Sequence, residues 1–176
     1  MKKNFFLLLI YTITSIAFGQ ELMTLQNSKS YPATSNWDFI CENYALTGLM
    51  KVQIAKTEKG GTLQLAIETT DTKYTIAGVV YVFLTDNTII VCSDKGIRKI
   101  SGSQIVSYYT FSTIEMNKLK TTDIQSIHFN IVGKPNGYSS QLGNFTAVNR
   151  RKYFSTAFDK SKKSYDTAAE ITSLYK

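Results

Sequence analysis

Alternating hydrophobic and polar positions dominate the middle of the chain. Residues 51–55 and 63–68 both follow a period of two, and a turn that contains Gly60 and Gly61 separates them. A period of two places alternate side chains on one buried face, and two such runs joined by a glycine-rich turn are typical of a hairpin. The sequence therefore predicts a β-hairpin over residues 51–68.

Further strands are expected on the C-terminal side of this hairpin. Residues 74–84 are apolar on both faces, which predicts a central strand covered on both sides, and Gly78 inside it indicates a bulge or a close backbone approach. Asp86-Asn87 predicts a tight turn, because short polar residues tolerate a positive φ. The other expected strands are residues 89–92, 97–100, 105–111, 124–132 and 142–148. Residues 37–49 fit a short helix or a strand equally well.

Two segments change to a helical period. Ser112 is followed three residues later by Glu115, which is the pattern of a capping box, so a short helix is expected to start there and end near Thr121. From Phe154 to Thr172, aromatic and small residues recur every three or four positions, and charged residues fall opposite them. This one-sided pattern predicts a C-terminal amphipathic helix packed on the sheet.

Together these elements predict an α+β fold. The expected structure is a mostly antiparallel sheet, with a meander of strands, a short inserted helix and a C-terminal amphipathic helix packed on the sheet. The alternative is an up-and-down β-barrel with an outer helix, which would enclose a cavity.

The first nineteen residues have the pattern of a secretory signal peptide. Lys2 and Lys3 precede an apolar run, and the segment closes with Ala17-Phe18-Gly19 before Gln20. We therefore expect cleavage after residue 19, and an extracytoplasmic protein that is periplasmic or secreted. The expected organisation is a signal peptide over residues 1–19, an N-terminal arm or linker over 20–36, and one globular domain over 37–176. No later segment approaches the roughly 20 apolar residues of a membrane span.

The net charge narrows the choice of partners. Loss of Lys2 and Lys3 lowers the formal net charge from +7 to +5, since residues 1–19 hold no acid. A small positive excess favours anionic cell-envelope glycan, lipid headgroups or another envelope protein as partners, and it equally fits an ordinary solubility charge. It does not favour nucleic acid.

The two cysteines, Cys41 and Cys92, leave two alternatives. An even number of cysteines in an oxidising compartment favours one disulfide between them. The alternative is a pair of buried free thiols that act as small hydrophobes, and the apolar run around Cys92 fits that alternative.

Candidate catalytic groups are sparse. The single histidine, His128, shares a strand face with Ser126 and Asn130, which indicates a structural residue on the solvent side. Asp71, Asp86 and Asp94 fall in turns, where aspartate commonly accepts backbone hydrogen bonds. No motif of a known nucleophile, metal or phosphate site is present. We therefore assign no catalytic residue and expect no cofactor or metal.

One basic cluster is a candidate ligand site. Arg150, Arg151, Lys152 and Tyr153 place three cations beside an aromatic ring, which suits a carboxylate, a phosphate or a sugar, although a solvated connector has the same composition. The leading hypothesis is a secreted or periplasmic, non-enzymatic binding or structural module of unknown ligand. Two alternatives are a barrel-type carrier of a small apolar ligand, and a hydrolase that uses a carboxylate or His128.

Overall fold

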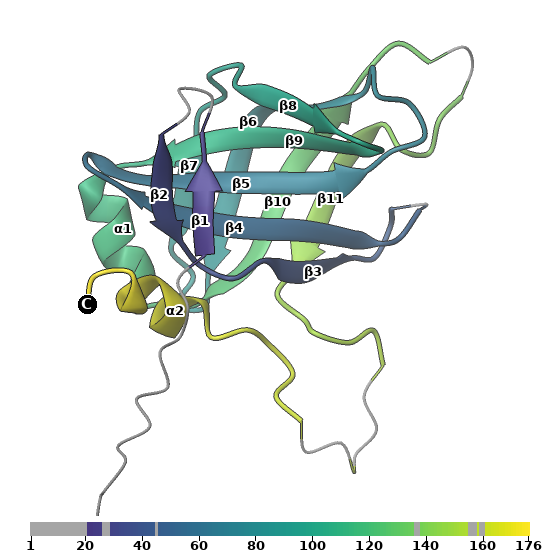
Figure 1. The fold of residues 1–176 in the computed structure, drawn as a ribbon. Coiled ribbons are helices and arrows are strands. Elements are labelled where there is room, and N and C mark those ends of the chain that lie inside the picture. Colours follow the sequence, from purple (N-terminus) through teal and green to yellow (C-terminus); the bar gives the residue numbers. More distant parts are fainter. Residues whose placement is uncertain (1–20, 26–28, 45, 136–137, 155–157, 159–160) are drawn as a thin grey trace, which may run out of the picture.

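The computed structural model describes residues 21–25, 29–44, 46–135, 138–154, 158 and 161–176. These residues form one sheet of eleven strands and two short helices (Figure 1). The elements in chain order are β1 (Glu21–Thr24), β2 (Ser30–Ala33), β3 (Trp37–Cys41), β4 (Leu49–Thr57), β5 (Gly60–Glu68), β6 (Thr75–Leu84), β7 (Ile89–Cys92), β8 (Arg98–Ser101), β9 (Gln104–Phe111), α1 (Thr113–Leu119), β10 (Ile124–Val132), β11 (Gly143–Val148) and α2 (Thr167–Ser173).

The strand order along the sheet is β7-β6-β10-β11-β3-β4-β5-β9-β8, and β2 adds to β4 outside this path. Every strand pairing is antiparallel. The expected hairpin over residues 51–68 is present as β4 and β5, with Val52 opposite Leu65. The α+β class with a mostly antiparallel sheet is therefore confirmed.

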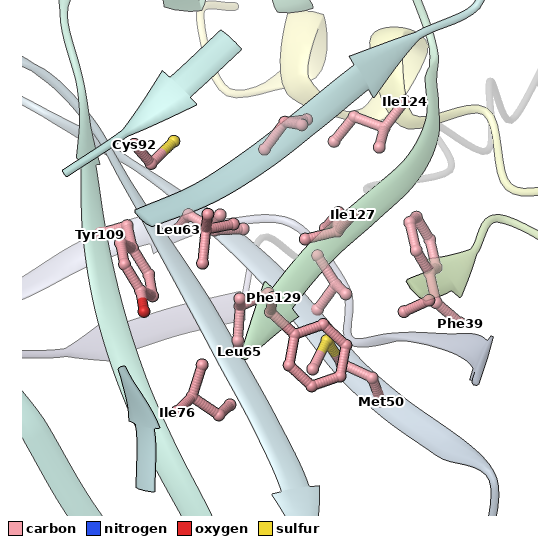
Figure 2. Packing of buried hydrophobic residues seen from close by; sticks show 14 of the residues in the cluster. Phe39, Met50, Leu63, Leu65, Ile76, Cys92, Tyr109, Ile124, Ile127 and Phe129 are labelled. Carbon is pink, nitrogen blue, oxygen red and sulfur yellow. The ribbon is translucent and has the colours of Figure 1, made fainter. Parts of the chain in front are cut away.

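The sheet curls, and side chains fill its concave inner face. Phe39, Met50, Leu65 and Phe129 come from β3, β4, β5 and β10, and Figure 2 shows them in this common core. Burial of a side chain of this size stabilises the folded state by about 1.5–3 kcal/mol. The inner face is therefore the main source of stability.

The capping box predicted at the first helix is confirmed. The Glu115 N–H donates to Ser112 Oγ over 3.2 Å, and the Ser112 N–H donates to Glu115 Oε2 over 2.6 Å. These bonds satisfy backbone donors that a helix start leaves open. Met116 and Leu119 on the opposite face of α1 join the core.

The second helix is shorter than expected. The sequence predicted a helix from Phe154 to Thr172, but α2 begins at Thr167, and Phe154 and Phe158 are exposed. The side chain of Asn149 explains part of the difference, because it accepts a hydrogen bond from the Tyr165 N–H and donates one to the Tyr165 carbonyl. Those backbone groups are thereby withdrawn from helical pairing.

Two short strands lie within residues 20–36, the range that the sequence analysis expects to be an arm or linker. Strands β1 and β2 pair with each other and run across the outer face of the sheet (Figure 1). Met23 and Ala33 are buried there against Ala66 and Val106 of β5 and β9, in a second, smaller hydrophobic cluster. Strands of only four residues are too short to show a clear alternation, so this packing could not be predicted from the pattern.

The two ends of the curled sheet meet at a seam that side chains bridge. We define the seam as Asp94, Arg98, Ser107 and Tyr109 facing the first half of β6. Ser107 Oγ and Arg98 Nε both donate to the Ile76 carbonyl, over 2.9 and 3.2 Å. The backbone of β6 is thus held here by side chains where a neighbouring strand would otherwise supply the partners.

Gly78 takes part in the same seam. Its N–H donates to Asp94 Oδ2 over 2.8 Å, and its carbonyl accepts from Tyr109 Oη over 3.4 Å. The φ of Gly78 is 78°, a left-handed conformation that glycine adopts without strain. The pairing of β6 with β10 shifts register around this residue, so the expected bulge is confirmed.

The seam shows why the barrel alternative is wrong. Strands β7 and β8 end the sheet at opposite sides and do not pair with each other, so the sheet stays open. Each has only four residues, and β7 pairs with β6 only from Val80 to Phe83. Strand β6 is also less covered than expected, because Val79 and Tyr81 are exposed on its outer face.

Cys41 and Cys92 are free thiols in the structure, in place of the disulfide expected from the sequence. They belong to β3 and β7, which are not neighbours in the sheet, and both are buried in the core. Burial raises the pKa of each thiol to about 12. A thiol that stays protonated is a poor nucleophile.

The seam predicts that Asp94 contributes strongly to the stability of the folded state. Asp94→Ala removes the acceptor of the Gly78 N–H and the partner of Arg98, so we expect the free energy of unfolding to fall by about 1–3 kcal/mol in a urea titration. Glu58→Ala is the matched control, because it breaks only an exposed ion pair with Lys29. An equally small effect of both changes would contradict the role of the seam.

The same variant has a predicted pH dependence. Partial burial opposes ionisation of Asp94, but the N–H groups of Gly96 and Gly78, together with Arg98, hold its pKa below the ordinary value. A lowered carboxyl pKa contributes stability above the unfolded value of about 3.9, and this contribution is lost as the pH falls through the folded pKa. The stability difference between wild type and Asp94→Ala should therefore shrink below about pH 4.

The buried thiols predict a distinct labelling result. Native protein should react slowly with a thiol reagent, because both sulfurs are buried. Denaturation without reductant should then release two reactive thiols per chain, counted by the mass added on alkylation. A denatured chain that gains no label would show that Cys41 and Cys92 are bridged.

Candidate functional site

A hollow on the outer face of the sheet, lined by described residues, is a candidate ligand site. Its volume is about 270 Å³. Strands β4, β5, β8 and β9 form its base, and the lining residues are Asn36, Lys51, Gln64, Ala66, Lys99, Ser101, Gln104, Val106 and Tyr108. We call this hollow the outer groove.

Strand register explains why these residues share one place. Lys51 lies opposite Ala66, Ala66 opposite Val106, and Val106 opposite Lys99. The two lysines are therefore about 14 Å apart at Cα, since neighbouring strands are spaced by about 4.8 Å. The small side chain of Ala66 and the buried side chain of Val106 lie between them and form a low apolar floor.

The rows on either side of this floor are polar. Gln64 lies opposite Tyr108, and Gln104 lies opposite Ser101. Side chains at every second position of a strand point to the same face, so both rows share the outer face with the lysines. The outer groove thus has an apolar floor, polar ends and a lysine on each side.

The β1–β2 hairpin bounds the groove. Tyr108 and Val106 pack against buried residues of the hairpin. Glu21 Oε2 accepts hydrogen bonds from Asn36 Nδ2 and from Gln53 Nε2, over 3.2 and 3.0 Å. These bonds fix the start of β1 beside the groove.

Most of the polar side chains in the groove have no protein partner. In the described part of the chain, no side-chain hydrogen bond or ion pair is made by Lys51, Gln64, Lys99, Ser101, Gln104 or Tyr108. Acidic side chains lie next to the groove in register, with Asp38 opposite Lys51 and Glu68 opposite Gln104, but neither belongs to its lining. The groove therefore presents free donors and acceptors to a ligand.

Tyr108 is the most informative of these residues. It is only 6% exposed, and burial raises the pKa of its hydroxyl, which therefore stays protonated. The hydroxyl has no hydrogen-bond partner among the described residues. It is nevertheless not one of the fully buried polar atoms that lack a partner, so its oxygen can be reached from outside. A buried tyrosine normally finds a partner for its hydroxyl, so this group is available to a molecule in the groove.

Each residue of the predicted basic patch contacts a different group of the protein. Arg150 pairs with Glu42 over 2.9 Å, and the guanidinium of Arg151 lies 4.9 Å from the ring centre of Tyr165. Lys152 Nζ donates to Ser161 Oγ, and Tyr153 Oη donates to the Gly48 carbonyl over 2.6 Å. These four side chains meet four different partners, so the structure shows no shared pocket for them. Anion binding by this segment stays a prediction.

His128 lies on the outer face of β10, as expected, and is half-buried. Its ring centre is 4.3 Å from that of Phe83, and no described carboxylate or thiol contacts it. The turn aspartates accept backbone hydrogen bonds, as the sequence predicted. Asp71 accepts from the Lys73 N–H and Asp86 from the Thr88 N–H. The Lys118 ammonium lowers the pKa of Asp86 to about 2, with help from that backbone N–H.

The described residues contain no group of three or more histidine, cysteine, aspartate and glutamate side chains arranged to hold a metal ion. Neither described helix has the length and apolar character needed to cross a membrane.

The outer groove could not be predicted from the sequence, because it depends on strand pairing between distant residues. The outward positions of β4 and β5 followed from the hairpin pattern, which places Lys51 and Gln64 on the polar face. The pairing of β5 with β9 joins residues about forty positions apart, as in Ala66 and Val106. Periodicity gives no information on such long-range register.

Comparison with known proteins adds no assignment. No protein-family model matches the chain, and no match was found among curated proteins or solved structures. The candidate site therefore depends on the geometry of this chain alone.

Proposed function

We propose that this protein is an exported, non-enzymatic binding module whose ligand site is the outer groove. The observation that carries the proposal is the set of unpartnered polar side chains around one hollow. By contrast, Arg98, Arg150 and Lys118, which lie outside the groove, pair with carboxylates of the protein. A concave site with a few convergent polar groups on a rigid sheet is the usual form of a ligand site.

Export is supported by the N-terminal pattern. A charged start, an apolar run and small residues before Gln20 are typical of a secretory signal peptide. Strand β1 begins at Glu21, so cleavage after residue 19 would leave every described element intact. A cleavage site directly before the first strand suits a protein that acts in the periplasm or outside the cell.

The inner face offers less support to a carrier of apolar ligands. Val52, Ile54, Leu63 and Leu65 are fully buried there by contact with one another and their neighbours. A carrier needs space for its ligand, and native cores are packed with few voids. A hydrolase has no support from His128, whose described ring contact is Phe83.

Export has a direct test. We expect the protein recovered from the extracytoplasmic fraction of its native host to have an intact mass that begins at Gln20. A cytosolic chain that retains Met1 would contradict the export part of the proposal. The measurement does not depend on the nature of the ligand.

The location of the binding site has an independent test. In a screen of small polar and apolar molecules by protein NMR, the amide signals that shift should belong to residues around the groove, such as Lys51, Ala66, Lys99 and Gln104. Hits that shift only core residues such as Leu65 or Phe129 would contradict the proposal and favour the carrier.

A further inference from the structure

We propose that the outer groove binds an acidic saccharide, a sugar chain that carries carboxylate or sulfate groups, lying across β4, β5, β9 and β8. This inference rests on the proposed function, because it names the ligand class of the same groove. Three properties of the groove carry it: the placement of its charges, the type of its polar groups and the shape of its floor.

The charges lie on two sides of the groove. Lys51 belongs to β4 and Lys99 to β8, with two strands between them. Both side chains are exposed, and neither ammonium group makes an ion pair with a described residue. Two separated cations match a ligand whose negative charges are spaced along its length, whereas a single small anion would be held better by cations that converge on one point.

The polar groups between the lysines suit sugar hydroxyls. Gln64 and Gln104 each offer an amide that donates and accepts, and Ser101 and Tyr108 each offer a hydroxyl that does the same. Sugar hydroxyls are also both donors and acceptors, so each can be matched by these side chains. The free hydroxyl of the buried Tyr108 gives the site one fixed group, since its ring is held in the second, smaller hydrophobic cluster under the β1–β2 hairpin.

The floor suits the flat, apolar side of a sugar ring. Ala66 and Val106 are apolar and lie between the polar rows. Ala66 is 4% and Val106 is 6% exposed, because they pack in one cluster with Met23 and Ala33 of the β1–β2 hairpin. The floor therefore offers a small apolar contact, and the lysines and the polar rows supply most of the recognition.

Two other ligand classes fit less well. The lining contains no arginine and no loop of free backbone N–H groups, which phosphate sites commonly use. An acidic peptide that binds as an added strand needs a free sheet edge. The four-residue strand β8 is such an edge, but β4, β5 and β9, which form the rest of the base, each have strands on both sides. The groove therefore favours a saccharide over a phosphate or a peptide strand.

The experiment measures binding by calorimetry with defined probes. The acidic probes are a short oligogalacturonate and a sulfated oligosaccharide of similar length. A neutral oligogalactan and an oligoglutamate peptide are the comparison ligands. The variants are Lys51→Gln, Lys99→Gln and Tyr108→Phe, and each is checked for an unchanged fold by its NMR spectrum.

Lys59→Gln is the matched control. Lys59 is exposed in the turn between β4 and β5, and its replacement changes the net charge of the protein by the same amount. It lies eight residues beyond Lys51 along the chain, at the far end of the hairpin.

We expect at least one acidic saccharide to bind and the neutral one to bind at least tenfold more weakly. Lys51→Gln and Lys99→Gln should each weaken binding by about tenfold, and Tyr108→Phe by about threefold, which are the losses expected for a charged and a neutral hydrogen bond. Lys59→Gln should leave the affinity unchanged. Binding should also weaken as salt is raised, because exposed charges are screened.

Several results would overturn the inference. They are the absence of binding to both acidic saccharides, equal binding of the neutral chain, equal loss with Lys59→Gln, or equal or tighter binding of the oligoglutamate peptide. If the NMR screen still maps ligands to the groove, the ligand class alone is wrong and the proposed function stands. If it maps them elsewhere, the proposed function fails as well.

Discussion

The seam between the two ends of the curled sheet determines the rest of the architecture. Strand β6 has a paired strand on only one side along its first half, so backbone groups of the buried Ile76 and the exposed Gly78 have no strand partner on the other side. Asp94, Arg98, Ser107 and Tyr109 supply the missing partners. These side chains let the sheet curl around its core without closing the ladder of backbone hydrogen bonds.

The curl of the sheet limits where a ligand can bind. A sheet that curls tightly enough to be bridged by side chains leaves little space inside, and the inner face is filled with large apolar residues such as Trp37 and Met50. The outer face has more room. The β1–β2 hairpin covers only part of it, and the outer groove lies beside the hairpin over β5 and β9.

Local structure was readable from the sequence wherever neighbouring residues decide it. The alternation over residues 51–68 predicted β4 and β5, the Ser112–Glu115 pair predicted the start of α1, and Asn87 adopts the positive φ expected of its turn. The elements that differ from the expectation depend on contacts with residues far away in the sequence. The C-terminal pattern was interrupted by the contacts of Asn149, and the N-terminal hairpin depends on packing against β5 and β9. The groove depends on the same long-range pairing.

The two buried thiols set a requirement on the rate of folding. For a chain exported into an oxidising compartment, Cys41 and Cys92 are shielded once β3 and β7 have joined the core. Before that point both sulfurs are open to oxidants and to other chains. Folding after export therefore has to be faster than thiol oxidation, which takes seconds to hours. A mutation that slows folding could thus cause covalent cross-linking, even where the finished structure is hardly weakened.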